Sequence, residues 1–398
     1  MKQARIEVAL KKSIDYIESI TISSKVNVPE DVVTCENRFF TWDNEKRTPS
    51  AKPYLFHWSY YNGVVMEGLF DLWEAAPAMG KKYLSYVRRY LDGMIVTDSV
   101  GQKTLSPARA GYVDCHGADC CKTAALLLRA ADQDHGYIDI CQNIYRDLTD
   151  TAHVNSKGHI VPKEYMEATL GQNYWHSWVG GRPPRYKVWL DGIYMLQPFI
   201  ARFAATTGDL AQLALVQKRL NWVAETLLAP NGLYYHAGSS GDDVCPYHWT
   251  RAMGWYGMAM VDVMEVLSEE YRSDRLAALN RFVDGVLKYQ KEDGMWTNLA
   301  DLPVTRTNRL EVSGTAMMVY TILKGVRCGW LDESYRAAAV KGFVAMVEEK
   351  LVDGKLTDIY LKAVADNTNN YERSDYYLPD EGKGLGPFIM ACAEMVYL

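Results

Sequence analysis

The sequence has few cysteines and no long apolar or basic run. Eight cysteines are thinly spread over 398 residues, which is typical of a reducing compartment where thiols stay free. No apolar stretch approaches the roughly 20 residues of a membrane span. The net charge is −6 and the basic residues form no run, so we expect neither a nucleic-acid nor a membrane partner. The first residues suggest an amphipathic helix, not a signal peptide, which favours a cytoplasmic location.

Common catalytic signatures are also missing. The sequence contains no Gly-rich phosphate loop and no G-x-S-x-G elbow. Asp114-Cys115-His116, followed by Cys120-Cys121, has metal-binding residue types. Its spacing matches no zinc pattern, however, and no second Cys/His pair completes it. We therefore expect no metal and no other cofactor.

The chain is rich in aromatic residues, which make up 12% of it, within an otherwise ordinary globular composition. Many of them lie in Gly/Asp-rich segments between apolar stretches. Aromatic faces in loops suit the apolar C–H faces of sugar rings, and core packing is the alternative explanation.

Most of the chain has helical periodicity. Leu213, Val216, Leu220, Val223 and Leu227, for example, place one apolar stripe on one helical face. Convincing alternating strands are absent. The pattern predicts helices over 3–23, 54–76, 81–97, 115–133, 135–153, 191–208, 210–229, 248–270, 274–292, 311–329, 333–352 and 383–397.

These segments form pairs with short gaps within a pair and long gaps between pairs. The short gaps are Thr207–Asp209, Tyr271–Ser273 and Trp330–Asp332. The long gaps open with a similar glycine turn, and such turns favour a positive φ. The turn glycines, Gly101, Gly158, Gly232, Gly294 and Gly354, recur about every sixty residues, as in a repeated helical hairpin.

Six such hairpins fill the chain, either as an open solenoid or as a closed ring. An open solenoid needs polar caps on its terminal repeats, whereas the last predicted helix is apolar to its end, from Leu385 to Leu398. We therefore expect an all-α (α/α)6 barrel, and a single domain over residues 1–398. The sequence carries no indication of the oligomeric state.

The starts of alternate helices carry reactive side chains, and in such a ring these starts lie at one end. They bear Asp114, Asp191, Arg251 and Glu311, beside aromatic residues such as Trp249. The alternative is that an aspartate at a helix start only caps the helix, which is worth about 1 kcal/mol.

Asp191 lies between apolar and aromatic neighbours, from Tyr186 to Met195. Burial there, and a second carboxylate nearby, would favour its protonated form. A carboxyl group that keeps its proton near neutral pH can act as a general acid. Asp114 is a candidate second carboxylate, and two carboxylates in a sugar site are typical of glycoside chemistry.

Four segments together resemble glycoside hydrolase family 105, the unsaturated rhamnogalacturonyl hydrolases, which are similar in fold to unsaturated glucuronyl hydrolases. They are Trp189–Met195 with Pro198-Phe199, Gly232–His236, Trp249–Trp255 and Glu311–Met317. Trp58-Ser59-Tyr60 with Gly63 fits the N-terminal motif of this family. The order and spacing cover nearly the whole chain, and the family fold is an (α/α)6 barrel.

The resemblance implies removal of a 4,5-unsaturated uronic acid from the non-reducing end of lyase products, as in pectin degradation. The aspartate matching Asp191 protonates C4 and helps water add at C5, and the resulting hemiketal opens and expels the neighbouring sugar. Asp114 would be the second acid. The residues that the resemblance assigns to uronate binding, water positioning and the subsite wall are Tyr60, His236, Trp249, Arg251 and Trp255.

Several points stay open at this stage. Asp119 competes with Asp114 for the second acid, and loop 171–187 does not align residue by residue. The segment Asp380–Gly384 lacks a histidine that the family often has. Unsaturated rhamnogalacturonan disaccharide is the favoured substrate, but other aglycones fit as well. An ordinary inverting glycosidase and a non-catalytic carbohydrate-binding toroid are the alternative functions.

Overall fold

The computed structural model describes residues 3–21, 41–43, 48–50, 58–105, 118–133, 135–150, 153–154, 160–161, 186–239, 243–365 and 368–398. Within these ranges the chain forms twelve α-helices and six short two-stranded ladders. No helix in these ranges combines the length and the apolar character needed to cross a bilayer.

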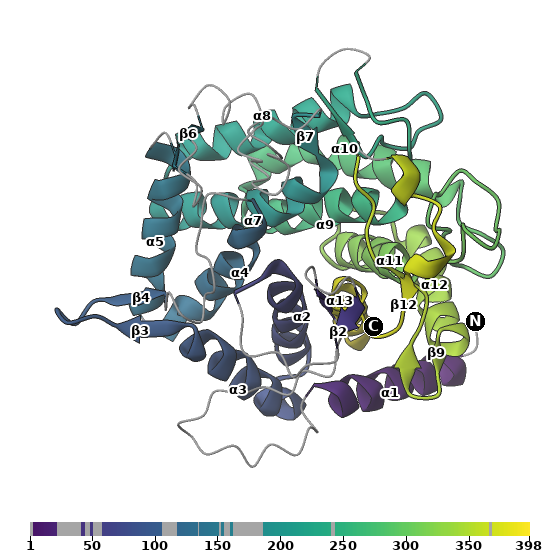
Figure 1. The fold of residues 1–398 in the computed structure, drawn as a ribbon, viewed down its shortest axis with the longest axis horizontal. Coiled ribbons are helices and arrows are strands. Elements are labelled where there is room, and N and C mark those ends of the chain that lie inside the picture. Colours follow the sequence, from purple (N-terminus) through teal and green to yellow (C-terminus); the bar gives the residue numbers. More distant parts are fainter. Residues whose placement is uncertain are drawn as a thin grey trace.

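Six of the helices form a closed inner ring (Figure 1). Each packs against the next along the chain, and the last, α13, packs tightly against the first, α2. The inner helices are α2 (Tyr60–Ala75), α4 (Ala118–Arg129), α7 (Leu190–Thr207), α9 (Thr250–Val266), α11 (Val312–Arg327) and α13 (Gly382–Val396).

The other six helices surround this ring, each against an inner partner. They are α3 (Pro77–Gly93), α5 (His135–Asp150), α8 (Leu210–Thr226), α10 (Glu269–Leu287), α12 (Arg336–Glu349) and α1 (Gln3–Ile20). Helix α1 packs on α12 and α13, so the first helix completes the outer ring beside the last one. The predicted (α/α)6 barrel is confirmed.

Short antiparallel ladders lie in the connections between helices. With two or three residues per strand, they are too short to show the alternation by which strands are recognised in a sequence. The pairs are β1 (Thr41–Asp43) with β2 (Thr48–Ser50), β3 (Ile95–Thr97) with β4 (Lys103–Leu105), β5 (His153–Val154) with β6 (Ile160–Val161), β7 (Val188–Trp189) with β8 (Ala237–Gly238), β9 (Leu351–Val352) with β10 (Lys355–Leu356), and β11 (Ile359–Tyr360) with β12 (Tyr377–Leu378).

The glycine turns of the repeat have the predicted backbone conformation. Gly101, Gly232, Gly294 and Gly354 have φ values of 85°, 88°, 109° and 71°, a region that side chains rarely adopt. Gly158 lies outside the described residues.

Some of the sequence-based boundaries are wrong. The predicted gap Tyr271–Ser273 lies inside α10, because the break comes earlier, at Ser268, which is the N-cap. Glu269 and Glu270 occupy the first turn of α10, where acidic groups interact favourably with the helix dipole. Helix α3 covers Pro77–Gly93 instead of 81–97, because Ile95–Thr97 pairs as strand β3.

Neighbouring inner helices run parallel, with their first turns side by side. A Cβ atom on Gly314 would lie 2.6 Å from Cγ2 of Thr250, and one on Gly386 would collide with Val64. All four of these residues lie in the first or second turn of an inner helix. The inner helices therefore all begin at one end of the barrel, which we call the mouth.

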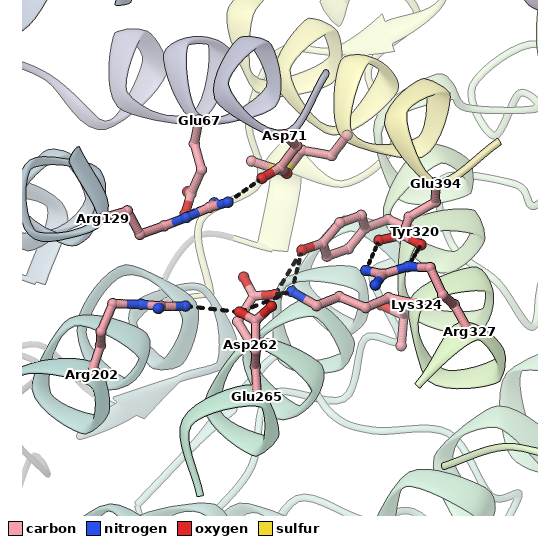
Figure 2. A network of polar contacts seen from close by, with 12 residues as sticks. Glu67, Asp71, Arg129, Arg202, Asp262, Glu265, Tyr320, Lys324, Arg327 and Glu394 are labelled. Carbon is pink, nitrogen blue, oxygen red and sulfur yellow. Dashed lines mark hydrogen bonds and ion pairs between the residues drawn. The ribbon is translucent and has the colours of Figure 1, made fainter. Parts of the chain in front are cut away.

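The opposite end is closed by ion pairs from the last two turns of the inner helices (Figure 2). We call this set the closing network, and every inner helix contributes to it. Its pairs are Arg129–Asp71 at 2.7 Å, Arg202–Glu265 at 2.8 Å, Lys324–Asp262 at 2.9 Å and Arg327–Glu394 at 2.6 Å.

Acidic groups crowd one side of the closing network. Glu67, Asp71 and Glu74 all pair with Arg129, and Glu67 also pairs with the buried Lys122. Burial, helped by the neighbouring carboxylate of Glu67, raises the pKa of Asp71 to about 7 despite the guanidinium. Burial also acts to raise the pKa of Glu265, but Lys324 and the nearby guanidinium groups lower it to about 2.

We predict that Lys324→Met strongly destabilises the fold. The variant leaves Asp262 and Glu265 without their ammonium partner, and breaking a buried ion pair in this way costs about 3–5 kcal/mol. Because the pKa of Glu265 is low in the folded state, the wild-type stabilisation is present above about pH 4.5 and is lost as the pH falls towards 2. Urea unfolding at pH 7 measures the effect. A loss below 1 kcal/mol would contradict it.

The Asp71 carboxyl makes stability depend on pH in the opposite direction to Glu265. Its pKa is higher in the folded chain than in the unfolded chain, so the free energy of unfolding falls as the pH rises from about 4 to about 7. Asp71→Asn removes this titration. We expect the free energy of unfolding of the variant, relative to that of wild type, to increase as the pH rises from 5 to 8. Urea unfolding across that range measures this difference. A stability difference that does not change with pH would argue against it.

Candidate active site

Asp191 lies in the first turn of α7, at the mouth. Trp189 occupies the N-cap position of that helix, so the capping explanation does not apply to Asp191. Its Oδ2 atom lies 2.9 Å from Nε2 of His236. Asp191 keeps 21% of its side-chain surface exposed, whereas His236 is fully buried. The buried His236 thus fixes the carboxyl group of Asp191, which remains accessible to solvent.

The histidine is brought to Asp191 by the backbone of the adjoining ladder. Strand β7 leads directly into α7 and pairs with β8, which follows His236 in the chain. The backbone N–H of Leu190 donates to the carbonyl of His236 at 3.0 Å. The imidazole is packed between aromatic rings, with Trp189 at 5.3 Å and Trp249 at 5.0 Å between ring centroids.

Trp249 is fixed by a side chain from the next repeat. Its indole N–H donates to Oδ1 of Asn298 at 2.8 Å, and the guanidinium of Arg251 lies 4.4 Å from its ring centre. Sequence reasoning missed Asn298, although the repeat held a signal. Asn298 follows Gly294 by four residues, as His236 follows Gly232.

Arg251 lies at the mouth, but most of its hydrogen-bonding capacity is already used. Its two terminal nitrogens donate to the carbonyls of Tyr360 and Leu361, the second at 3.0 Å. The Nε atom is buried and has no hydrogen-bond partner. Arg251 therefore ties α9 to β11 and the residue after it, and it brings a positive charge to the mouth.

Trp255 lies one turn deeper on α9 than Arg251. It is buried and stacks on Tyr194, with centroids 5.0 Å apart and planes 17° apart. The ammonium of Lys122 lies 3.8 Å from the other ring of this stack, that of Tyr194. Trp255 is therefore part of the barrel interior below the mouth and is not grouped with Trp249 at the rim.

Tyr60 is half-buried at the start of α2, with its ring 4.1 Å from that of Tyr61. The ammonium of Lys383, in the first turn of α13, lies 4.7 Å from the Tyr61 ring. Lys383 is buried and pairs with Glu381 at 2.5 Å. Burial lowers its pKa. Lys383 brings a second basic group to the mouth, and sequence reasoning did not select it.

Glu311, which the helix-start pattern grouped with the reactive residues, is a cap. It is fully buried, and its carboxylate accepts hydrogen bonds from Ser313, Gly314 and the backbone N–H of Tyr360, at 2.6–3.0 Å. The capping alternative therefore accounts for this carboxylate.

The second proposed acid cannot be placed beside Asp191. Asp114 lies outside the described residues, and only the backbone of Asp119 is described, within α4. Of loop 171–187, only Tyr186 and Lys187 are described. In the part of the chain that the structure covers, no group of three or more His, Cys, Asp or Glu residues is arranged to hold a metal ion.

Comparison with known proteins places this barrel among carbohydrate-active enzymes. The family model of Glycosyl Hydrolase Family 88 matches residues 34–398. A family 105 glycoside hydrolase from C. acetobutylicum is 27% identical, with a TM-score of 0.70 over 86% of this chain and 94% of that one.

Two further relatives are informative. The unsaturated glucuronyl hydrolase of Bacillus sp. GL1, which degrades glycosaminoglycan, shares the fold at 13% identity, with a TM-score of 0.67 over 96% of each chain. Protein Atu3128 of Agrobacterium fabrum is 28% identical over 228 residues, which are 50% of this chain and 98% of that protein. The predicted relationship is confirmed, and the chain belongs to Glycosyl Hydrolase Family 88, with family 105 enzymes among its structural relatives.

Proposed function

We propose that this protein removes 4,5-unsaturated uronic acids from the non-reducing ends of oligosaccharides by hydrating the C4=C5 bond. The observation that carries the proposal is the partly exposed carboxyl of Asp191 at the mouth, held by the buried His236 between two tryptophans. The related enzyme from Bacillus sp. GL1, an unsaturated glucuronyl hydrolase, supports it.

In the proposed reaction, Asp191 gives its proton to C4 and the double-bond electrons form the new C–H bond. Positive charge then develops at C5 and the ring oxygen. Water adds to C5 and returns one proton to Asp191, which restores the acid. The C5 hemiketal opens to a ketone, which leaves a hemiacetal at C1, and this hemiacetal expels the aglycone sugar. A single carboxyl group that both gives and takes a proton is sufficient for this sequence.

Recognition of the uronate carboxylate would come from the positive charge at the mouth. Inner-helix N-termini carry partial positive charge, and Arg251 and Lys383 lie in the first turns of α9 and α13. Tyr60 and Trp249 would contact the sugar ring, His236 would position water, and Trp255 would support the floor. Asp114 remains the proposed second acid, which would stabilise the positive charge near C5.

The favoured aglycone is rhamnose, so that the substrate is the unsaturated disaccharide released from rhamnogalacturonan by a lyase. A panel of unsaturated disaccharides with different aglycones tests this choice. Loss of ultraviolet absorbance measures turnover, because the substrate double bond is conjugated to its carboxylate.

We predict that Asp191→Asn lowers kcat by roughly 10²–10⁴-fold, the usual contribution of a general acid–base group. The matched control is Asp209→Asn, which alters an aspartate at the start of the outer helix α8, where it caps Gln212 and binds Tyr145. The control should retain activity and lose only stability. Near-normal turnover by Asp191→Asn, measured by absorbance, would remove Asp191 from its proposed role.

Turnover in heavy water separates hydration from ordinary displacement at C1. We expect one solvent deuterium at C4 of the released uronic acid, detected by NMR or mass spectrometry. An inverting glycosidase would leave C4 unlabelled, and a non-catalytic toroid would bind the disaccharide without consuming it. Either result would overturn the proposed reaction.

A further inference from the structure

His236 contacts a second polar group, the hydroxyl of Tyr371, which has no role in the proposed reaction. The hydroxyl of Tyr371 contacts Nδ1 of His236, on the side of the ring that faces away from Asp191. The same hydroxyl lies 3.2 Å from Sγ of Cys245. Tyr371, His236 and Cys245 are all fully buried. Hydrogen bonds thus connect the four side chains in series, from Cys245 through Tyr371 and His236 to Asp191.

Tyr371 is fixed on several sides. Its ring stacks on Tyr247, with centroids 4.1 Å apart and planes 13° apart. Its carbonyl accepts a hydrogen bond from Nδ2 of Asn298 at 2.9 Å, and Asn298 in turn holds Trp249. A phenol held in this way fixes the rotation of the imidazole that it binds.

The chain of four groups has matched hydrogen bonds in both protonation states of Asp191. With the carboxylate ionised, Nε2–H donates to Asp191, the tyrosine O–H donates to Nδ1, and the thiol donates to the tyrosine oxygen. With Asp191 protonated, its O–H donates to Nε2, Nδ1–H donates to the tyrosine oxygen, and the tyrosine O–H donates to the sulfur. In each state both imidazole nitrogens and the tyrosine hydroxyl have partners, and the histidine stays uncharged.

The phenol keeps its proton throughout. Burial raises the pKa of Tyr371 well above its usual range, and the neighbouring groups that act in the same direction are Cys245, Asp191 and Tyr186. A neutral hydroxyl can both donate and accept, which the reversal requires.

We propose that Tyr371 is a positioning residue that holds His236 so that its tautomer follows the protonation state of Asp191. The inference rests on the proposed function, in which Asp191 must give and take a proton in each turnover. Tyr371 does not touch the substrate in this account, and it acts only through the imidazole.

The test is Tyr371→Phe, which keeps the stacked ring and removes the hydroxyl. We expect kcat to fall about 10–100-fold, as when an orienting partner of a functional histidine is lost, with little change in KM. Tyr377→Phe is the matched control, because its hydroxyl only anchors the same segment, to Thr307 and Arg309. The control should keep the kcat of wild type.

The pH profile distinguishes positioning from a general structural role. In Tyr371→Phe, Nδ1 loses its partner in both states: a buried Nδ1–H lacks an acceptor when Asp191 is protonated, and a bare Nδ1 lacks a donor when Asp191 is ionised. A buried N–H without a partner is the less tolerated of the two, so the protonated state is disfavoured more. The descending limb of kcat against pH should therefore move to lower pH by roughly one unit. An unchanged kcat and limb in a folded Tyr371→Phe variant would overturn the inference.

A second readout does not depend on activity. Nitrogen NMR of His236, assigned by its loss in His236→Gln, should show the change of tautomer at a lower pH in Tyr371→Phe than in wild type. The same switch at the same pH in both proteins would refute the role of Tyr371. Wild type that consumes no unsaturated disaccharide would refute the proposed function instead, and the NMR comparison would still decide whether Tyr371 positions His236.

Discussion

The contact between the last and the first inner helix is the constraint on which the site depends. Gly386 of α13 meets Val64 of α2 so closely that a side chain would not fit, and this contact closes the ring. Closure brings all the inner-helix N-termini to the mouth and all the C-termini to the other end. The partial charges of the helix ends follow the same division. Arg129, Lys324 and Arg327 lie in last turns, where cations complement the dipole, and the mouth is left to receive an anion.

The two ends of the barrel use charge differently. At the closed end, acids and bases from all six inner helices pair with one another in the closing network (Figure 2). At the mouth, Glu311 and Glu381 are engaged by helix caps, while Asp191 keeps a free face. The side chains that hold this face come from segments far apart in the chain: Asp191 from α7, His236 and Cys245 around β8, Asn298 from the next repeat, and Tyr371 from the segment before α13. The position of Asp191 therefore depends on the whole ring.

Much of the ring could be predicted from the sequence, because helical periodicity and the apolar last helix are local properties of the chain. The placement of Asp191, Arg251 and Trp249 at one end followed from the repeat. The hydrogen-bond partners of the site side chains could not be predicted in the same way. The terminal nitrogens of Arg251 donate to carbonyls of β11 and of the residue after it. Tyr371 contacts His236 although the two are 135 residues apart in the chain. The break at Ser268 was missed because the apolar pattern continues past it.

The structure of the Asp191→Asn variant bound to an unsaturated disaccharide tests the role of the mouth most directly. We predict that the uronic acid ring lies in the mouth, with C4 about 3–3.5 Å from the side chain of residue 191 and the carboxylate of the sugar towards Arg251 and Lys383. A disaccharide bound elsewhere, or bound in the mouth with C1 instead of C4 and C5 facing residue 191, would contradict it.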